Sequence, residues 1–253
     1  MDLAPEELQF LSLTDILRES VAIPKRSPQT FYLMTLALIF PLSFAILAHS
    51  LFTHPILNQL ASDPLADPSQ TRHEWTLLLT FQFCYLIFLF AFSLLSTATV
   101  VFTVASLYTS KPVSFTSTIS AIPSVVSVLE PIYGLAAMKK SYELLKGRAR
   151  MAFILVFGYL AICGVIGGIF GSVVVHGGDR YGVLWRIVVG GFLVGVLVIV
   201  NLVGLLVQSV FYYVCKSYHH QGIDKTALHD HLGGYLGEYV PLKSSVQMEN
   251  LDA

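Results

Sequence analysis

The sequence alternates long apolar stretches with short polar ones, and four of the apolar stretches contain no Asp, Glu, Lys or Arg. A helix needs roughly 20 apolar residues to cross about 30 Å of hydrocarbon, and one such charge at its centre costs on the order of 3 kcal/mol. The pattern therefore predicts an all-α, polytopic helical membrane protein with about four transmembrane helices. The predicted spans cover about residues 31–52, 75–100, 151–175 and 187–212.

The second apolar stretch, residues 75–108, is too long for one span and too short for two. Its 34 residues would extend roughly 50 Å as a helix. No Gly or Pro interrupts it to make a turn. We therefore predict one long helix whose end richer in Ser and Thr, residues 96–110, projects beyond the hydrocarbon toward the cytosol.

Lys and Arg are distributed unevenly about the four spans. Twelve of the 15 precede the first span, lie between the second and third, or follow the fourth, and three, including the boundary residue Arg186, lie in the other two connections. An excess of Lys and Arg marks the cytosolic side of a membrane protein. We therefore predict a cytosolic N-terminal segment (1–30), a transmembrane domain (31–215) with a cytosolic loop (109–150), and a cytosolic tail (216–253). We expect this membrane to be an endomembrane or the plasma membrane.

Composition and motifs argue against several functions. Hydrophobic residues make up 55% of the chain and charged residues 12%, and the net charge of −1 does not suit direct binding of nucleic acid. The three cysteines lack the spacing of a zinc site, and the sequence has no phosphate-binding loop, dinucleotide fingerprint or paired catalytic carboxylates. No predicted span carries a carboxylate, His or Arg away from its ends, although ion-coupled transport usually needs one. We therefore expect no enzyme activity, catalytic residue, cofactor or metal.

Small residues form a stripe in the third span and a pair in the fourth. Their spacing of three, four and seven residues places the stripe on one helix face, and small faces let helix backbones approach closely in lipid. We predict that these glycines pack helices together, and a lined substrate path is the alternative. The residues are Gly164, Gly167, Gly168 and Gly171 in the third span and Gly191 and Gly195 in the fourth.

Three amide side chains lie within the predicted apolar helices. Asn201 and Gln208 belong to the fourth and Gln82 to the second. An amide at membrane depth usually forms a hydrogen bond to another helix. We predict that all three link helices, with Asn201 part of the packing interface.

The loop before the third span contains an amphipathic segment. From Pro131 to Lys146, apolar residues repeat every three or four positions, and Gly147 suits a C-terminal stop. Lys139, Lys140 and Lys146 lie away from the centre of the apolar stripe, as in a helix that lies on an anionic membrane surface. We predict such a membrane-surface helix. A second amphipathic pattern covers residues 5–21.

The C-terminal tail offers two weaker chemical signals. It contains four histidines, which we interpret as part of a solvated tail helix rather than as metal ligands. Cys215 lies beside Lys216 at the predicted cytosolic edge of the membrane, which makes it a candidate for palmitoylation, with an inert thiol as the alternative.

Three blocks of the chain resemble a plant family of uncharacterised multi-pass membrane proteins, some of which are named as binding a polyadenylate-binding protein. The blocks are PEELQFLSLTDILRESVAIPKRSPQTFYL, VVSVLEPIYGLAAMKKSYELLKGRAR and YYVCKSYHHQGIDKTALHDHLGGYLGEYVPLKSS. The central block is also similar to the non-catalytic membrane domain of some glycerophosphodiester phosphodiesterases. The resemblance implies two further spans between residues 120–123 and 125–130 that this chain lacks, so we expect a shortened form.

These observations favour a non-enzymatic membrane protein that acts as an interaction or membrane-organising component. Its partners would be the lipid bilayer and cytosolic proteins that contact the loop (109–150) and the tail (216–253). The alternative is a transporter or channel for a neutral or lipid-like substrate, which would use the glycine-faced helices. The sequence does not define the oligomeric state.

Overall fold

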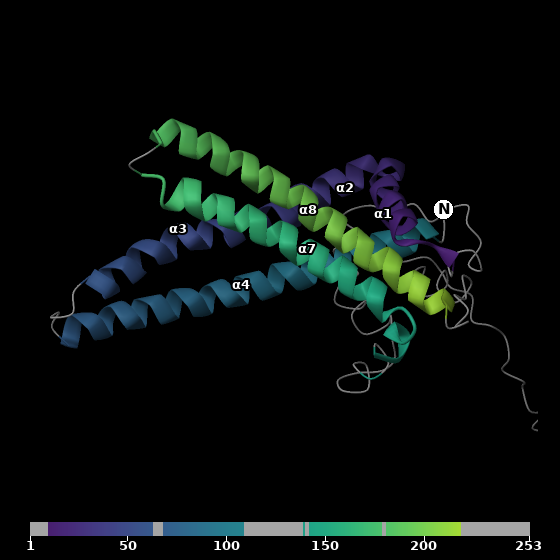
Figure 1. Ribbon diagram of the computed structural model, residues 1–253, viewed down its shortest axis with the longest axis horizontal. Helices are drawn as coiled ribbons and strands as arrows, with labels where there is room; N and C mark the ends of the chain where they lie inside the picture. The colour runs from purple at the N-terminus through teal and green to yellow at the C-terminus, as the bar shows by residue number, and fades with distance from the viewer. Residues whose placement is uncertain (1–9, 63–67, 109–138, 140–141, 179–180, 219–253) are drawn as a thin grey trace, which may run out of the picture.

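The computed structural model describes residues 10–62, 68–108, 139, 142–178 and 181–218, and every regular element in these ranges is a helix. The helices shown in Figure 1 have the following bounds. They are α1 (Leu13–Ala22), α2 (Pro28–Met34), α3 (Phe40–Ser62), α4 (Pro68–Tyr108), α7 (Ala149–Phe170) and α8 (Val183–Tyr218). A 3₁₀ turn (Ile23–Arg26) follows α1, and two π-helical segments, η3 (Thr35–Ile39) and η4 (Gly171–Val175), precede α3 and follow α7.

Four helical stretches are long and apolar enough to cross a membrane, as the sequence predicts. They cover Pro28–Asn58, Glu74–Leu107, Ala149–Val175 and Val183–Tyr218, and each contains one predicted span. The second is a single uninterrupted helix, which confirms the interpretation of the long apolar stretch. All four stretches are longer than the predicted spans, because polar and apolar residues that flank the predicted spans continue the helix.

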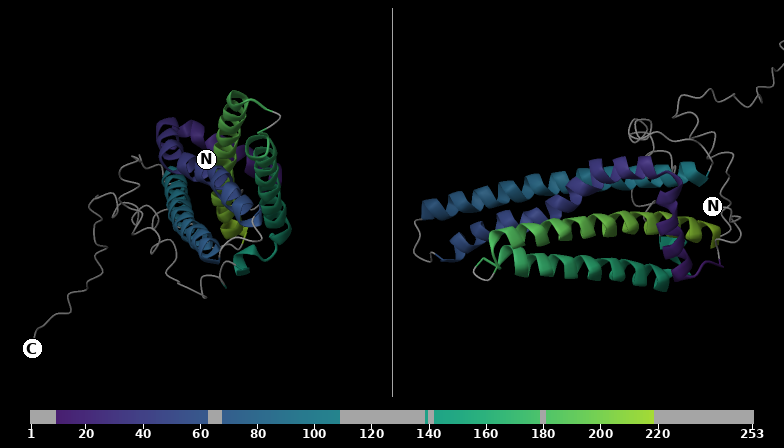
Figure 2. Two further views of the ribbon diagram at one scale, coloured as in Figure 1. Left: turned by 90° about the vertical axis from the view of Figure 1, so that its left-hand side faces the viewer. Right: turned by 90° about the horizontal axis from the view of Figure 1, so that it is seen from above.

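The helices form an elongated bundle of two antiparallel pairs (Figure 2). The C-terminal end of α3 and the N-terminal end of α4 lie at the same end of the bundle as the turn between η4 and α8. The short helix α1 lies at the opposite end, across the C-terminal part of α8. The N-terminal helix and the end of α8 therefore share one end of the bundle. Which end faces the cytosol remains a prediction from the charge distribution.

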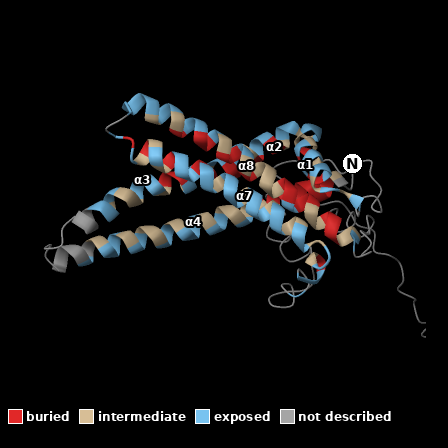
Figure 3. Ribbon diagram, in the orientation of Figure 1, coloured by how far each residue is buried: buried red, intermediate tan, exposed pale blue. Residues whose placement is uncertain are grey.

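The end that carries α1, here called the packed end, has a dense apolar core. Side chains from α1, α2, α4 and α8 form it, and most of the buried residues in Figure 3 lie in this region. Its fully buried members are Ile16, Met34, Val100, Leu206, Val210 and Val214. The Ser- and Thr-rich part of α4 belongs to this core: Ser96, Thr99, Thr103 and Ser106 are buried, and each hydroxyl donates to the carbonyl four residues earlier. This part of α4 can pack here because these hydroxyls leave no donor unsatisfied. Its projection beyond the hydrocarbon toward the cytosol stays a prediction.

The helix α1 begins with a capping box. The Ser12 hydroxyl accepts a hydrogen bond from the backbone N–H of Asp15 (3.4 Å), and the Asp15 carboxylate accepts one from the backbone N–H of Ser12 (3.1 Å). Both bonds satisfy N–H groups that the first turn leaves free. Ile16 and Ser20 face the core, whereas Leu17 and Val21 are exposed, so the amphipathic pattern of residues 5–21 is confirmed only in part.

The opposite end, here called the open end, is more loosely built. A second apolar cluster joins α3, α7 and α8 midway along the bundle and includes Leu47, Ile166, Phe170, Leu193 and Leu197. Beyond it the α3–α4 pair and the α7–α8 pair diverge (Figure 1). Most of the outer face of α7 is exposed as well.

The first apolar stretch is not a uniform α-helix. Its π-helical segment η3 ends just before Pro41, and the N–H of Phe40 donates to the carbonyl of Thr35, five residues earlier. A proline in a helix lacks an N–H and its ring crowds the preceding turn. The wider π turn next to Pro41 is a recognised way to accommodate such an interruption of the helix.

Candidate functional site

A chain of polar side chains crosses the centre of the bundle. The Tyr159 hydroxyl of α7 donates to Oδ1 of Asn201 (2.7 Å), and Nδ2 of Asn201 on α8 donates to the Ser43 hydroxyl of α3 (2.8 Å). The Ser43 hydroxyl in turn donates to the carbonyl of Ile39 (2.8 Å). Asn201 is buried. One amide thus ties three helices together, which confirms its predicted role in helix packing.

The glycines that approach other helices are not the predicted ones. A Cβ added at Gly190 would lie 3.6 Å from Phe170 and Val174, and one at Gly204 would lie 3.0 Å from the Tyr159 ring. The predicted glycines instead have open space where a Cβ would stand. They are Gly164, Gly167, Gly168, Gly171, Gly191 and Gly195.

The prediction that this stripe packs α7 against α8 is therefore wrong for the described chain. The reason is rotational: α7 turns Ile166 and Phe170 toward the other helices and its glycines outward. Gln208 is also exposed, so it does not link helices in the described part of the chain.

A second polar group joins α3 to α4. Nε2 of His49 lies 2.8 Å from Oε1 of Gln82 and 3.3 Å from the Thr53 hydroxyl, and the His49 ring stacks on Tyr85 with centroids 4.1 Å apart. Gln82 therefore links helices as predicted. The sequence suggests that no histidine lies away from the ends of the spans, and this is wrong, because α3 continues to Ser62 and leaves His49 well inside the apolar helix.

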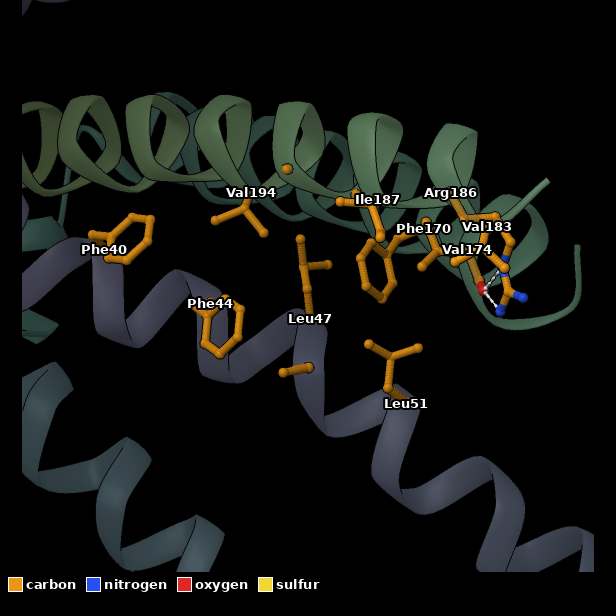
Figure 4. Close-up of a pocket in the computed structure, with 13 residues that line it drawn as sticks. Phe40, Phe44, Leu47, Leu51, Phe170, Val174, Val183, Arg186, Ile187 and Val194 are labelled. Atoms are coloured by element: carbon orange, nitrogen blue, oxygen red, sulfur yellow. Dashed lines mark hydrogen bonds between the residues drawn. The ribbon is translucent and has the colours of Figure 1, made fainter. Parts of the chain in front are cut away.

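A pocket lies between α3 and the α7–α8 pair at the open end. It has a volume of about 560 Å³, which falls within the range of roughly 300–1,000 Å³ typical of ligand pockets. Figure 4 shows the side chains of α3 on one wall and those of α8 on the other. The α3 wall consists of Phe40, Phe44, Leu47, Ala48 and Leu51. The other walls consist of Phe170, Val174, Val183, Ile187, Gly190, Gly191 and Val194.

One charged residue, Arg186, lies at the end of this apolar pocket (Figure 4). Its Nε donates to the carbonyl oxygen of Val174 (2.9 Å), and its Nη2 donates to the same oxygen. Val174 lies in the last turn of the α7–η4 helix, where carbonyls lack partners within the helix and attract a cation. Arg186 therefore closes the end of this helix and fixes the turn to α8.

Little of this pocket could be identified from the sequence. Gly191 lines it, although we predicted a packing role for that residue. The four α3 positions Phe40, Phe44, Leu47 and Leu51 repeat at helical spacing, but so do many residues in an apolar helix. The usable signal is Arg186, a cation placed four residues into the last apolar helix.

Two predicted surface features stand differently in the structure. Cys215 is buried, with 3% of its surface exposed, so its thiol is enclosed by neighbouring side chains and is not available for palmitoylation in this conformation.

Lys139 and Lys146 of the predicted membrane-surface helix are exposed. Lys140 and residues 131–138 lie outside the described residues, so the membrane-surface helix stays a prediction. Its stop at Gly147 is confirmed, since this residue adopts a φ of +97°. Most of the predicted loop (109–150) and of the tail (216–253) also lies outside the described residues.

Within the described ranges, no three His, Cys, Asp or Glu side chains gather in a way that could hold a metal ion. The rings of His54 and His176 lie edge to face with centroids 4.4 Å apart, between α3 and the end of η4. His176 also forms a hydrogen bond through Nδ1 to the carbonyl of Gly171 (2.8 Å). This pair serves as a contact between α3 and the α7–α8 turn.

The fold and the pocket define a class: an all-helical protein with four helices suited to a membrane and a lateral apolar pocket between them. The chain belongs to the family described as Domain of unknown function (DUF8558), which matches residues 1–125 and 122–251. The two matched segments overlap at residues 122–125. A search of curated proteins finds no match, and a search of solved structures finds none.

Proposed function

We propose that this protein is a membrane-embedded lipid-binding component that organises the surrounding bilayer by holding a lipid chain between α3 and α8, without catalysing a reaction. The observation that carries the proposal is the pocket of about 560 Å³, which is apolar along its length and lies between helices of membrane-spanning length. This function combines the two expectations from the sequence, a membrane organiser and a protein with a lipid-like ligand.

Aromatic residues support the placement of the open end at a membrane surface. Trp75, Tyr181 and Trp185 lie near the ends of helices at this end of the bundle and are about half exposed. Trp and Tyr are enriched at the interface between hydrocarbon and water. The pocket then opens from the interface into the hydrocarbon, where lipid chains are the available ligands.

Exposure of the lining residues supports an occupant that enters from the side. Phe44, Leu51, Val183 and Ile187 line the pocket, yet 40–70% of the surface of each is exposed. In a bilayer such surfaces contact acyl chains. A pocket with an apolar lining that is already exposed to lipid needs no rearrangement of the helices to admit a chain.

The proposal is tested with a diacyl lipid that carries a photoreactive group in the middle of one chain, added to vesicles that contain the full-length protein. Labelling of residues 40–51 and 183–194 is measured relative to labelling of residues 153–165 on the exposed face of α7. We expect the pocket segments to be labelled several-fold more, and an excess of unlabelled lipid to reduce only the pocket signal. Equal labelling of both regions would refute the proposal.

Two matched variants sharpen this test. Gly191→Phe fills the pocket, and Gly195→Phe adds the same side chain one turn further along α8, outside the pocket. Neither substitution meets another atom at its Cβ, so both should fold. We expect Gly191→Phe to reduce labelling of residues 40–51 several-fold and Gly195→Phe to leave it unchanged. The same response from both variants would contradict the proposed site.

A further inference from the structure

The pocket combines apolar walls with a single cation, and this combination defines the class of lipid that it would hold. Lipid tails are as apolar as the side chains that line the pocket, so the hydrophobic effect provides no drive for a tail to leave the bilayer. A bare apolar groove would therefore admit every lipid with similar preference. Selection has to come from a polar contact, and Arg186 is the charged residue that the structure places in the lining.

Arg186 has hydrogen-bonding capacity left after its structural contacts. A guanidinium has five N–H donors, and the two hydrogen bonds of Arg186 use Nε and one N–H of Nη2. Among the described residues, no side chain or carbonyl accepts a hydrogen bond from Nη1, and no carboxylate forms an ion pair with Arg186. With respect to the described residues, two donors of Nη1 and one of Nη2 therefore have no acceptor in the protein and are suited to an anion.

The depth of Arg186 matches that of a lipid headgroup. The helix α8 has 36 residues and so extends about 54 Å, which is longer than the 40–45 Å of a bilayer that includes its headgroup regions. The ends of α8 therefore reach the headgroups. Arg186 is the fourth residue of the helix, while Gly191 and Val194 lie one to two turns deeper on the wall of the pocket.

We infer that the pocket binds a glycerophospholipid, with one acyl chain between α3 and α8 and the lipid phosphate hydrogen-bonded to Arg186. The inference rests on the proposed function and adds the headgroup chemistry. A guanidinium is suited to this contact because its planar donors match two phosphate oxygens. Pairing with the phosphate also neutralises a cation that would otherwise stand beside an apolar wall.

The experiment compares two photoreactive lipids with identical acyl chains, phosphatidylglycerol and diacylglycerol, in vesicles that contain the full-length protein. For the wild type we expect phosphatidylglycerol to label residues 40–51 and 183–194 about tenfold more than diacylglycerol, as one or two charge-assisted hydrogen bonds would produce. Arg186→Gln should reduce the ratio of phosphatidylglycerol labelling to diacylglycerol labelling to near one. Arg186→Lys should leave an intermediate ratio, because lysine keeps the positive charge but lacks the planar paired donors of the guanidinium.

The ratio of labelling by phosphatidylglycerol to labelling by diacylglycerol separates headgroup recognition from folding and from the proposed function. A folding defect in Arg186→Gln would reduce labelling by both lipids and leave their ratio unchanged. Arg150→Gln removes an exposed cation at the packed end and should leave the wild-type ratio. A wild-type ratio near one, with both lipids labelling the pocket, would overturn the headgroup inference while the proposed function stands. Labelling by neither lipid would overturn both.

Discussion

The packed end and the open end of the bundle are built from the same long helices, yet their side chains have different neighbours. At the packed end Leu206, Val210 and Val214 of α8 are fully buried against α1, α2 and α4. At the open end Val183, Ile187 and Phe192 of the same helix are 65–70% exposed. Because lipid is as apolar as these residues, burial within the protein is not obligatory for them. The difference indicates that the packed end stabilises the fold, and it leaves the open end exposed for the lipid contacts proposed above.

The largest effect expected from this comparison concerns one leucine at each end. Leu206→Ala removes a fully buried side chain and should lower the free energy of unfolding by about 3 kcal/mol, through lost contacts and a residual cavity. Leu51→Ala removes the same atoms from a residue of the pocket wall whose own surface is 40% exposed. It should therefore lower the free energy of unfolding by less than about 1 kcal/mol. Equilibrium unfolding in detergent micelles measures both. Equal losses would mean that the open end is packed as tightly as the other.

The second effect concerns the polar chain that joins α3, α7 and α8 at the centre of the bundle, between its two ends. Asn201→Leu removes the acceptor of the Tyr159 hydroxyl and the donor to Ser43. Since interhelical hydrogen bonds are worth only modest energies in membrane proteins, and an orphaned hydroxyl adds to the loss, we expect a destabilisation of about 1–2 kcal/mol. Gln208→Leu, on an exposed part of the same helix, should change stability by less than about 0.5 kcal/mol. A larger loss at Gln208 would place that amide in a contact outside the described chain.

The number of long helices and their approximate positions follow from the sequence, because the absence of charge and the length of each apolar stretch decide them. A stretch such as residues 151–175, with no charged residue, has few alternatives to a helix of that length. The polar link at Asn201 is also predictable, since a buried amide needs a partner. The sequence does not identify Tyr159 and Ser43 as those partners, because the rotation of each helix about its axis is set by packing.

The glycine stripe illustrates where the sequence stops being informative. Gly164, Gly167, Gly168 and Gly171 define a face of α7, but an apolar helix in lipid can present any of its faces to a neighbour. The structure turns the bulkier Ile166 and Phe170 inward, and Phe170 meets Gly190 of α8. The position of the pocket depends on the same rotations, together with the divergence of two helix pairs that are far apart in the sequence, so only its cation, Arg186, has a signal in the sequence.

A smaller effect is expected where the packed end meets the turn before α7. Gly147 adopts a φ of +97°, and a Cβ added there would lie 2.8 Å from the ring of Tyr218. Gly147→Ala should therefore lower stability by about 1 kcal/mol. Gly158→Ala, inside α7 with open space around it, should be neutral or raise stability by up to about 1 kcal/mol, because alanine favours a helix. Thermal unfolding in micelles measures the change in stability of both variants. A Gly147→Ala variant that is more stable than the wild type would contradict the strained turn.

The smallest effect concerns the first turn of α1, which covers the packed end. Hydrogen bonds from the Ser12 side chain, and then from its backbone N–H, hold the pKa of the exposed Asp15 carboxyl below its usual value of 3.8. A carboxyl whose pKa is lowered by folding stabilises the folded state above its unfolded pKa, and this stabilisation is lost as the pH falls through the folded pKa. The docking of α1 should therefore weaken slightly below about pH 3.8 and not at neutral pH.

A nitroxide at Val21→Cys, in a chain whose three native cysteines are replaced, reports this change as faster motion of the label, since position 21 is on the exposed side of α1. The rise in mobility between pH 5 and pH 2.5 should be small, because an exposed carboxylate is screened by solvent. Asp15→Asn removes the titrating group and should give mobility that is independent of pH in this range, while α1 remains helical. A wild-type label whose mobility changes equally in the Asp15→Asn chain would assign the pH response to another group at the packed end.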